Sequence, residues 1–134
     1  MMETNHMVFV FGSNTAGIHG AGAALYARNN KGAEMGVGEG PTGMSYALPT
    51  KYRAHGGRLV TCHISDVAQA AQRFMDFARE HFYMRFQVTR IGCGLAGFKD
   101  SEIAPLFRDA PDNCYFDTAW TSWLKPTTKY WGTM

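Results

Sequence analysis

The sequence predicts an α/β protein with three α/β/α layers, in which helices cover both faces of a mixed, mostly parallel sheet. Short apolar runs typical of buried strands alternate along the chain with helix-forming segments, and this order favours such a sheet. Two glycine-rich loops follow strand-like runs, and 15 of the 134 residues are glycine, about 11% against a usual level of about 7%. Hydrophobic residues make up 46% of the chain, which is enough for a core and excludes wholesale disorder. We therefore expect one domain over residues 1–134, with a core at about 7–117.

The first half of the chain begins with an apolar, β-rich run at residues 7–11, which predicts a strand covered on both faces. The strand is expected to stop at Gly12. A glycine loop then leads into an alanine-rich helix at 23–28. Residues 36–43 match G-x-G-x-x-G, but this pattern binds dinucleotides only between a strand and a helix, and here a strand-like segment follows. The segment has too many glycines for a regular element and is expected to be a flap over a site or a long turn.

The second half contains the clearest helix, at 66–82, where apolar residues recur at steps of three and four and Ser65 or Asp66 can cap the first turn. His81 lies on its apolar stripe and is expected to be a partly buried packing residue. The remaining expected elements are a strand at 45–49 closed by Pro49, an extended segment at 58–62, a strand at 86–91, a short helix at 101–107 and a strand at 114–116.

Composition excludes several classes of function. The formal net charge of +2 is too small to indicate nucleic acid or an anionic membrane as the main partner. The longest apolar run has five residues, far short of the roughly 20 that a spanning helix needs, and the amino terminus does not resemble a secretion signal. Three scattered cysteines fit neither a disulfide scaffold nor a zinc ribbon. We expect a cytoplasmic protein with no membrane partner, no metal and no cofactor.

The two glycine loops are the main functional signal. Glycine lets the backbone approach a ligand closely, and free amides at the start of a helix favour an anion. Gly20 to Gly22 open the first helix, and Gly92 to Gly97 precede the short helix at 101–107. Ligands of parallel sheets bind beyond the carboxyl ends of the strands, where both loops are expected. Two such cradles would suit a diphosphate, and the alternative is a pair of tight turns without a ligand.

Three segments occur in the order seen in macrodomains: Gly20–Ala23 entering a helix, the strand end Leu48–Lys51, and Arg90–Leu95. The chain most closely resembles the branch that contains the terminal ADP-ribose protein glycohydrolase and the antitoxins that remove ADP-ribose from DNA. It is also similar to small, uncharacterised macro-like proteins of bacteria and phages. The resemblance covers about residues 7–117 and implies a macrodomain-like fold with a cleft for ADP-ribose.

The resemblance also implies site residues. Lys51 matches a lysine that attacks the anomeric carbon of the ribose, which an amine can do only in its neutral form. Ala96 stands where the protein glycohydrolase has an acidic residue, and Asp100, four positions later, is the candidate substitute. The early aspartate that binds adenine in macrodomains is missing, so a related nucleotide is an alternative ligand. The implied ligand-binding residues are Asn14, near the distal ribose, and those of the two loops: Gly20, Ala21, Gly22, Ala23, Gly92, Cys93, Gly94, Leu95, Ala96, Gly97 and Phe98.

Three functions stay open at this point. The first is hydrolysis of an ADP-ribosyl linkage on protein or nucleic acid through Lys51, and the second is binding or sequestration of such a nucleotide without catalysis. The third is interaction with nucleic acid or protein through the aromatic tail at 118–134, which holds all three tryptophans; the alternative is that this tail covers the domain or forms a dimer contact. Cys93 is expected to be a small buried thiol rather than a nucleophile. His19 is expected to face solvent, and the alternative is a phosphate contact.

Overall fold

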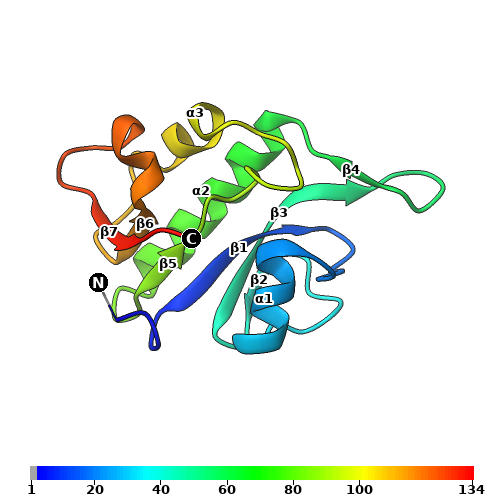
Figure 1. Cartoon of the computed structure of the whole chain (residues 1–134), viewed down its shortest axis with the longest axis horizontal. Helices are drawn as coiled ribbons and strands as arrows, with labels where there is room; N and C mark the ends of the chain where they lie inside the picture. The colour runs from blue at the N-terminus through cyan, green and yellow to red at the C-terminus, as the bar shows by residue number, and fades with distance from the viewer. Residues whose placement is uncertain (1–2) are drawn as a thin grey trace.

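The computed structural model describes residues 3–134, which form a seven-stranded sheet with helices on both faces (Figure 1). The sheet has the order β2-β3-β1-β5-β6-β7, and β4 pairs with β3 outside this path. The elements are β1 (Val8–Asn14), α1 (Gly22–Asn30), β2 (Gly40–Thr42), β3 (Ser45–Arg53), β4 (Leu59–Thr61), α2 (Ile64–Glu80), β5 (Phe86–Val88), α3 (Asp100–Ile103), the 3-10 turn η1 (Ala104–Phe107), β6 (Cys114–Asp117), the 3-10 turn η2 (Thr118–Trp123) and β7 (Lys129–Gly132).

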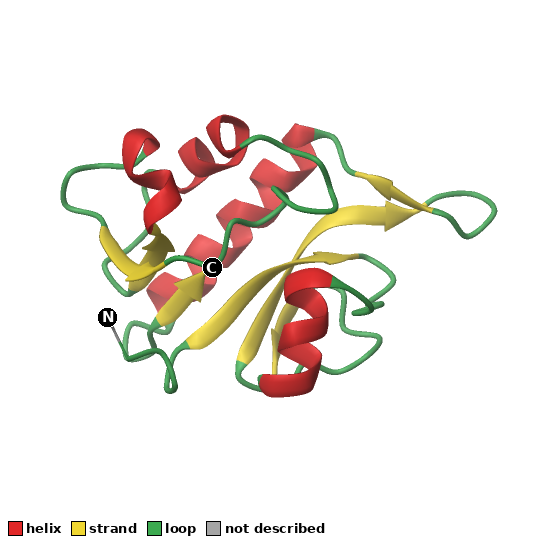
Figure 2. Ribbon diagram, viewed as in Figure 1, coloured by secondary structure: helices red, strands yellow, loops and turns green. Residues whose placement is uncertain are grey.

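Five strands run parallel, and this confirms the predicted fold class. β1 pairs in parallel with β3 and with β5, and β6 pairs in parallel with β5 and with β7. The two short strands β2 and β4 run antiparallel to β3. The carboxyl ends of β1, β3 and β5 therefore meet at one edge of the sheet, where the chain leaves each strand in a loop (Figure 2).

The central strand β1 divides the core into two layers because its side chains alternate between the faces of the sheet. Phe9 and Phe11 belong to a small cluster with Ala24 and Ala27 of α1. Val8 and Val10 belong to the large cluster on the opposite face, which α2, α3 and both 3-10 turns cover. These four residues of β1 are all buried, so the apolar run is covered on both faces of the sheet, as the sequence predicts.

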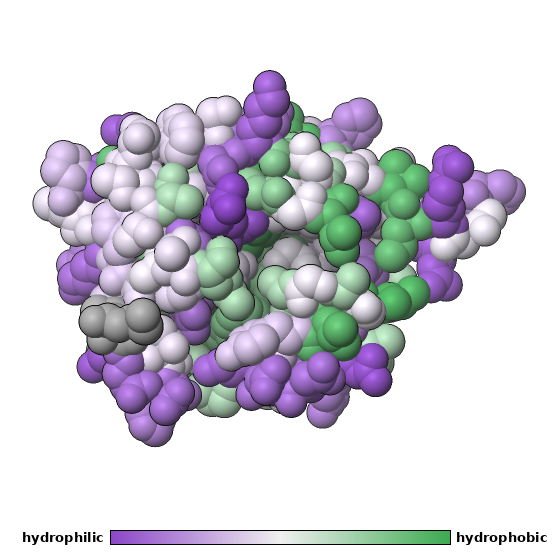
Figure 3. Space-filling view, viewed as in Figure 1, coloured by the Kyte–Doolittle hydropathy of each residue, from purple (hydrophilic) through white to green (hydrophobic). Residues whose placement is uncertain are grey.

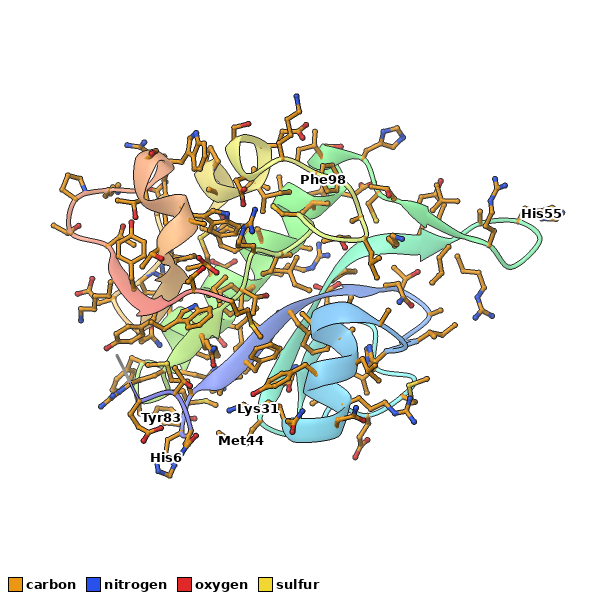
Figure 4. The ribbon with its side chains drawn as sticks, in the orientation of Figure 1. His6, Lys31, Met44, His55, Tyr83 and Phe98 are labelled. Carbon is orange, nitrogen blue, oxygen red and sulfur yellow. The ribbon has the colours of Figure 1, made fainter. Side chains whose placement is uncertain are left out.

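β3 is longer than predicted because Pro49 does not end it. Along β3, the antiparallel pairing with β2 extends from Ser45 to Ala47, and the pairing with β4 extends from Lys51 to Arg53. Pro49 lies in the gap between these partners, where the missing N–H disrupts no ladder on that side. β3 then continues into a hairpin with β4 that projects from the body of the molecule, with His55 at its tip (Figure 4).

The segment at 36–43 differs from its predicted form. Its end is a regular strand, β2, and Glu39 forms a two-pronged ion pair with Arg73 of α2, with distances of 2.6 and 3.0 Å. This contact fixes Glu39 against α2, whereas the start of the segment lies against the carboxyl end of β1, where the Gly36 amide donates to the carbonyl of Gly17 at 2.8 Å. α2 also begins earlier than expected, with His63 as the residue before its first turn, so Asp66 lies within that turn.

The aromatic tail forms part of the sheet and of the core. Trp120 of η2 is fully buried, and β7 adds a strand parallel to β6. Trp131 is 7% exposed, and its indole N–H donates to the carbonyl of Val88 at 3.0 Å. The core therefore extends beyond residue 117, and these two rings are unavailable as a stacking surface for bases. The interpretation that the tail covers the domain is correct.

None of the helices within residues 3–134 is long and apolar enough to span a lipid bilayer.

Candidate functional site

A cavity of about 590 Å³ lies at the carboxyl ends of β1, β3 and β5, and we call it the central cavity. Its walls come from the end of β1, the start of α1, the residues around Lys51 on β3 and the loop between β5 and α3. Figure 3 shows the molecule hollowed near the middle of this face, with hydrophobic residues around the opening. The volume lies within the range of about 300–1,000 Å³ typical of small-molecule sites. Both glycine loops thus meet at one edge of the sheet, as the sequence predicts.

The lining of the central cavity is apolar with two cations. Lys51 and Arg90 are its charged residues, and no aspartate or glutamate of the described chain lines it. Ile18, Leu59 and Leu95 supply much of the apolar wall. Low-dielectric walls strengthen the field of the two cations inside a cavity. The central cavity is therefore suited to an anionic ligand that also carries an apolar or aromatic part.

The first glycine loop presents the amino end of α1 to the cavity. Gly20, Gly22 and Ala23 line the cavity, and Gly22 has φ of 57°, a value that favours glycine. The first backbone hydrogen bond of the helix runs from Leu25 N–H to the carbonyl of Ala21. Within residues 3–134, no hydrogen bond uses the amides of residues 20–24, so they are available to an anion at the positive end of the helix dipole.

Asn14, which was predicted to lie near a ribose, holds this loop in place. Its Nδ2 donates to the carbonyl of Ile18 at 2.7 Å, and its Oδ1 accepts from the Ile18 amide at 3.1 Å. The side chain is 7% exposed and lines the floor of the cavity. Asn14 therefore shapes the approach to α1, and one Nδ2 hydrogen and one Oδ1 lone pair remain unused by the bonds to Ile18.

The second glycine loop lines the cavity only in part. Gly92, Cys93, Gly94, Leu95 and Ala96 lie on the cavity wall, whereas Gly97 and Phe98 do not. The amides of Cys93, Gly97 and Phe98 are bonded to carbonyls of Arg90, Gly94 and Gly92.

The prediction that all the amides of residues 92–98 bind a ligand is therefore wrong for these three. Phe98 points away and packs partly buried against the large core cluster beside the loop that leads into α3 (Figure 4). Gly92, at φ of 76°, turns the chain there, and a Cβ on it would lie 3.1 Å from the Phe98 ring.

Lys51 lies where the sequence places it, on β3 beside the end of β1. It pairs in register with Asn14, is half-buried and lines the cavity. Its ammonium group forms no ion pair with any residue between 3 and 134. The amine is therefore available to a ligand at the wall of the cavity.

Asp100 has a different environment from the one expected of a catalytic acid. It does not line the cavity. Its carboxylate accepts two hydrogen bonds from the Arg90 guanidinium, at 2.9 and 2.6 Å, and one from the Trp120 indole N–H at 2.7 Å. The ion pair with Arg90 and the bond from Trp120 lower the pKa of Asp100 to about 2, against the opposing effect of partial burial. This geometry favours a structural role for Asp100.

The lowered pKa of Asp100 predicts an acid-sensitive contribution to stability. The group stabilises the fold above its ordinary value of 3.8, and the stabilisation is lost as the pH falls from about 4 to about 2. Asp100→Asn should lower the free energy of unfolding by about 1–2 kcal/mol at neutral pH, allowing for the partial exposure of the pair, and by much less near pH 2. Urea unfolding of both proteins across this range measures the difference. Asp112→Asn, an exposed carboxylate, is the control, and an equal loss in both variants would contradict the assignment.

Cys93 and His19 lie near the central cavity without being suited to catalysis. Cys93 is partly buried on the cavity wall and not fully buried as expected; burial and the neighbouring Asp100 raise the pKa of its thiol to about 12, so the group stays protonated. His19 is fully buried, with its ring edge-on to Phe11 at 5.2 Å, and it does not line the cavity. The prediction that His19 faces solvent is wrong, because the loop packs its side chain against Phe11, on the face of the sheet that α1 covers.

Several cavity residues carried no signal in the sequence. Their side chains are ordinary in type, and only the fold brings them to the cavity wall. Thr50 and Thr89 lie within the predicted segments Leu48–Lys51 and 86–91, and an expectation based on strand ends could have included them. The residues of the cavity wall that were not predicted are Gly12, Ser13, Ile18, Ala24, Tyr26, Thr50, Leu59, Thr89, Arg90, Ile91 and Met134. Within the described part of the chain, no three side chains of the metal-binding types cluster as a metal site would require.

Comparison with known proteins identifies the fold and no function. No protein-family model matches the chain, and no curated protein matches it. Among solved structures, the chain is similar to a protein of unknown function from Bacteroides thetaiotaomicron, with a TM-score of 0.51 and 21% sequence identity, over 77% of this chain and 80% of that chain. At this identity the likeness shows a shared α/β fold and nothing more.

Proposed function

We propose that the central cavity binds ADP-ribose or a related nucleotide derived from NAD. The observation that carries this proposal is the convergence of two sets of amides in one cavity: those of residues 20–24, and those of Gly92 and Gly94–Ala96, which no hydrogen bond within residues 3–134 uses. Lys51 adds a positive charge without an ion-pair partner among the described residues, and Arg90 adds a guanidinium that Asp100 balances in part and whose other N–H donors suit a phosphate. The apolar wall at Ile18 and Leu95 would pack against a base or a ribose.

The proposed reaction is hydrolysis of an ADP-ribosyl linkage with Lys51 as nucleophile. The neutral amine of Lys51 forms a bond to the anomeric carbon, and the bond to the acceptor breaks, with the electron pair and the amine's proton leaving on the acceptor. Opening of the ribose ring gives an imine. Water then adds to this imine and releases ADP-ribose, which regenerates the amine. The amides would hold the diphosphate during both steps.

Lys51→Ala tests the reaction separately from binding. We expect this variant to release no ADP-ribose from a modified protein or oligonucleotide above the uncatalysed rate, because no other amine lines the cavity within residues 3–134. Its affinity for ADP-ribose should fall by about tenfold or less, since one of two cations is lost. Chromatography of released ADP-ribose and calorimetric titration measure the two quantities.

The matched control is Lys125→Ala, which removes an exposed lysine paired with Asp109 far from the cavity. Wild-type release by Lys51→Ala would refute the nucleophile, and equal loss in both variants would refute its specificity.

A second candidate function is binding without catalysis, and one observation favours it. No aspartate or glutamate of the described chain lines the cavity, and Asp100, the candidate acid, is engaged by Arg90 and Trp120. A binder would retain an ADP-ribosylated ligand unchanged over hours, whereas the hydrolase would release free ADP-ribose. A time course with the wild-type protein distinguishes the two.

A further inference from the structure

Arg90 differs from the other cation of the central cavity in how firmly it is held. It lies two residues beyond the end of β5, in the loop that leads to α3, and its side chain lines the cavity with 41% exposure. Its Nε and Nη2 donate to the two carboxylate oxygens of Asp100, at 2.9 and 2.6 Å. This paired geometry fixes the plane of the guanidinium.

Asp100 is itself held from the core. Its Oδ1 also accepts the indole N–H of Trp120 at 2.7 Å. Trp120 is fully buried and stacks on Phe107, with ring centroids 5.7 Å apart. Three residues, from the loop after β5, from α3 and from η2, therefore form one line of contacts: Trp120 to Asp100 to Arg90. This line begins in the core of the carboxyl-terminal segment and ends at the cavity wall.

The unused donors of Arg90 explain what this arrangement can do. A guanidinium carries five N–H donors, and the pair with Asp100 uses one on Nε and one on Nη2. The other donors belong to a group that stays charged at every physiological pH. A guanidinium fixed in this way by Asp100, on a wall that is otherwise largely apolar, is an anion contact whose ordering cost is met before the ligand arrives.

We propose that Arg90 is the charged contact of the central cavity for a phosphate group, and that Asp100 and Trp120 are its positioning residues. This inference rests on the proposed function for the identity of the whole ligand, but the anion contact itself can be measured with inorganic pyrophosphate. Trp120, in the carboxyl-terminal segment, thereby contributes to ligand binding without touching the ligand.

Three variants separate contact from positioning. Arg90→Gln removes the charge and should weaken binding of both pyrophosphate and ADP-ribose by about 10- to 100-fold. Arg90→Lys keeps the charge without the planar pair and should recover part of this loss. Trp120→Phe keeps a ring in the core but removes the N–H, and we expect a loss of about three- to tenfold. Arg108→Gln, an exposed arginine outside the cavity, is the control.

The most direct readout is the Nε–H resonance of Arg90 in ¹⁵N-labelled full-length protein. Titration with pyrophosphate should shift this resonance in the wild type, and in Trp120→Phe the same shift should require about three- to tenfold more pyrophosphate. An Arg90 resonance that ignores saturating pyrophosphate, or an Arg90→Gln variant with wild-type affinity, would overturn the inference. A shift with pyrophosphate but no binding of ADP-ribose would support this inference and contradict the proposed function.

Discussion

Trp120→Ala is expected to lower the free energy of unfolding by about 3–5 kcal/mol, the range for loss of a large buried aromatic ring. Trp120 is fully buried, stacks on Phe107 and lies 6.0 Å from the Phe116 ring. The substitution leaves a void between η1, β6 and η2 and removes the hydrogen bond to Asp100. For a chain of this length the melting temperature should fall by more than about 10 °C.

Trp123→Ala is the matched control because Trp123 lies three residues further on in the same 3-10 turn and is only partly buried. Trp123→Ala should lower the free energy of unfolding by clearly less than Trp120→Ala does. Calorimetric melting of the two variants and the wild type gives the comparison. If Trp120→Ala melted within a few degrees of the wild type, the tail could not be part of the core. Trp120 could then not hold Asp100 and Arg90 in position.

Gly20→Asp is expected to weaken ADP-ribose binding by about 100-fold or more while leaving the fold intact. The backbone of Gly20 does not need glycine, because its φ is not positive and a Cβ there would meet only Ile18, at 4.0 Å. A carboxylate at this position would lie beside the amides of α1 and would face the negative charges of the bound diphosphate. Repulsion between unit charges about 4 Å apart amounts to roughly 4 kcal/mol near a protein surface.

Gly20→Asn separates this charge effect from the effect of size. The two side chains have nearly the same volume, so a loss that appears with aspartate and largely disappears with asparagine comes from charge. Isothermal titration at constant ionic strength measures both affinities. Equal affinities for the wild type and Gly20→Asp would show that the amino end of α1 does not bind the phosphates.

The sequence is informative where one pattern decides the structure. The apolar run at residues 7–11 and the stripe of α2 identify the two elements that build both layers of the core. The glycine loops could be assigned to one edge of the sheet because parallel strands end together. The two elements follow from local composition, and the position of the loops follows from the rule that parallel strands end at the same edge of a sheet. The structure agrees with both.

Other features depend on contacts that no local pattern contains. Pro49 stays within β3 because two separate antiparallel partners leave it unpaired on one side. His19 is buried because its ring packs edge-on against Phe11. The Asp100 carboxylate forms hydrogen bonds with Arg90 and Trp120, which are 10 and 20 residues away in the sequence. The tail could not be placed because its aromatic residues fit equally well a core, a dimer contact or a stacking surface until β7 is seen to pair with β6.

A titration of ¹⁵N-labelled protein with ADP-ribose, followed through the backbone amide resonances, tests the central claim most directly. We expect the largest saturable shifts at Gly20, Gly22, Ala23 and the loop residues Gly94 and Leu95, whose amides line the central cavity. Amides already bonded within the second loop, such as those of Gly97 and Phe98, should move less. An unchanged spectrum at saturating ADP-ribose, or shifts confined to surfaces away from these two loops, would contradict the account.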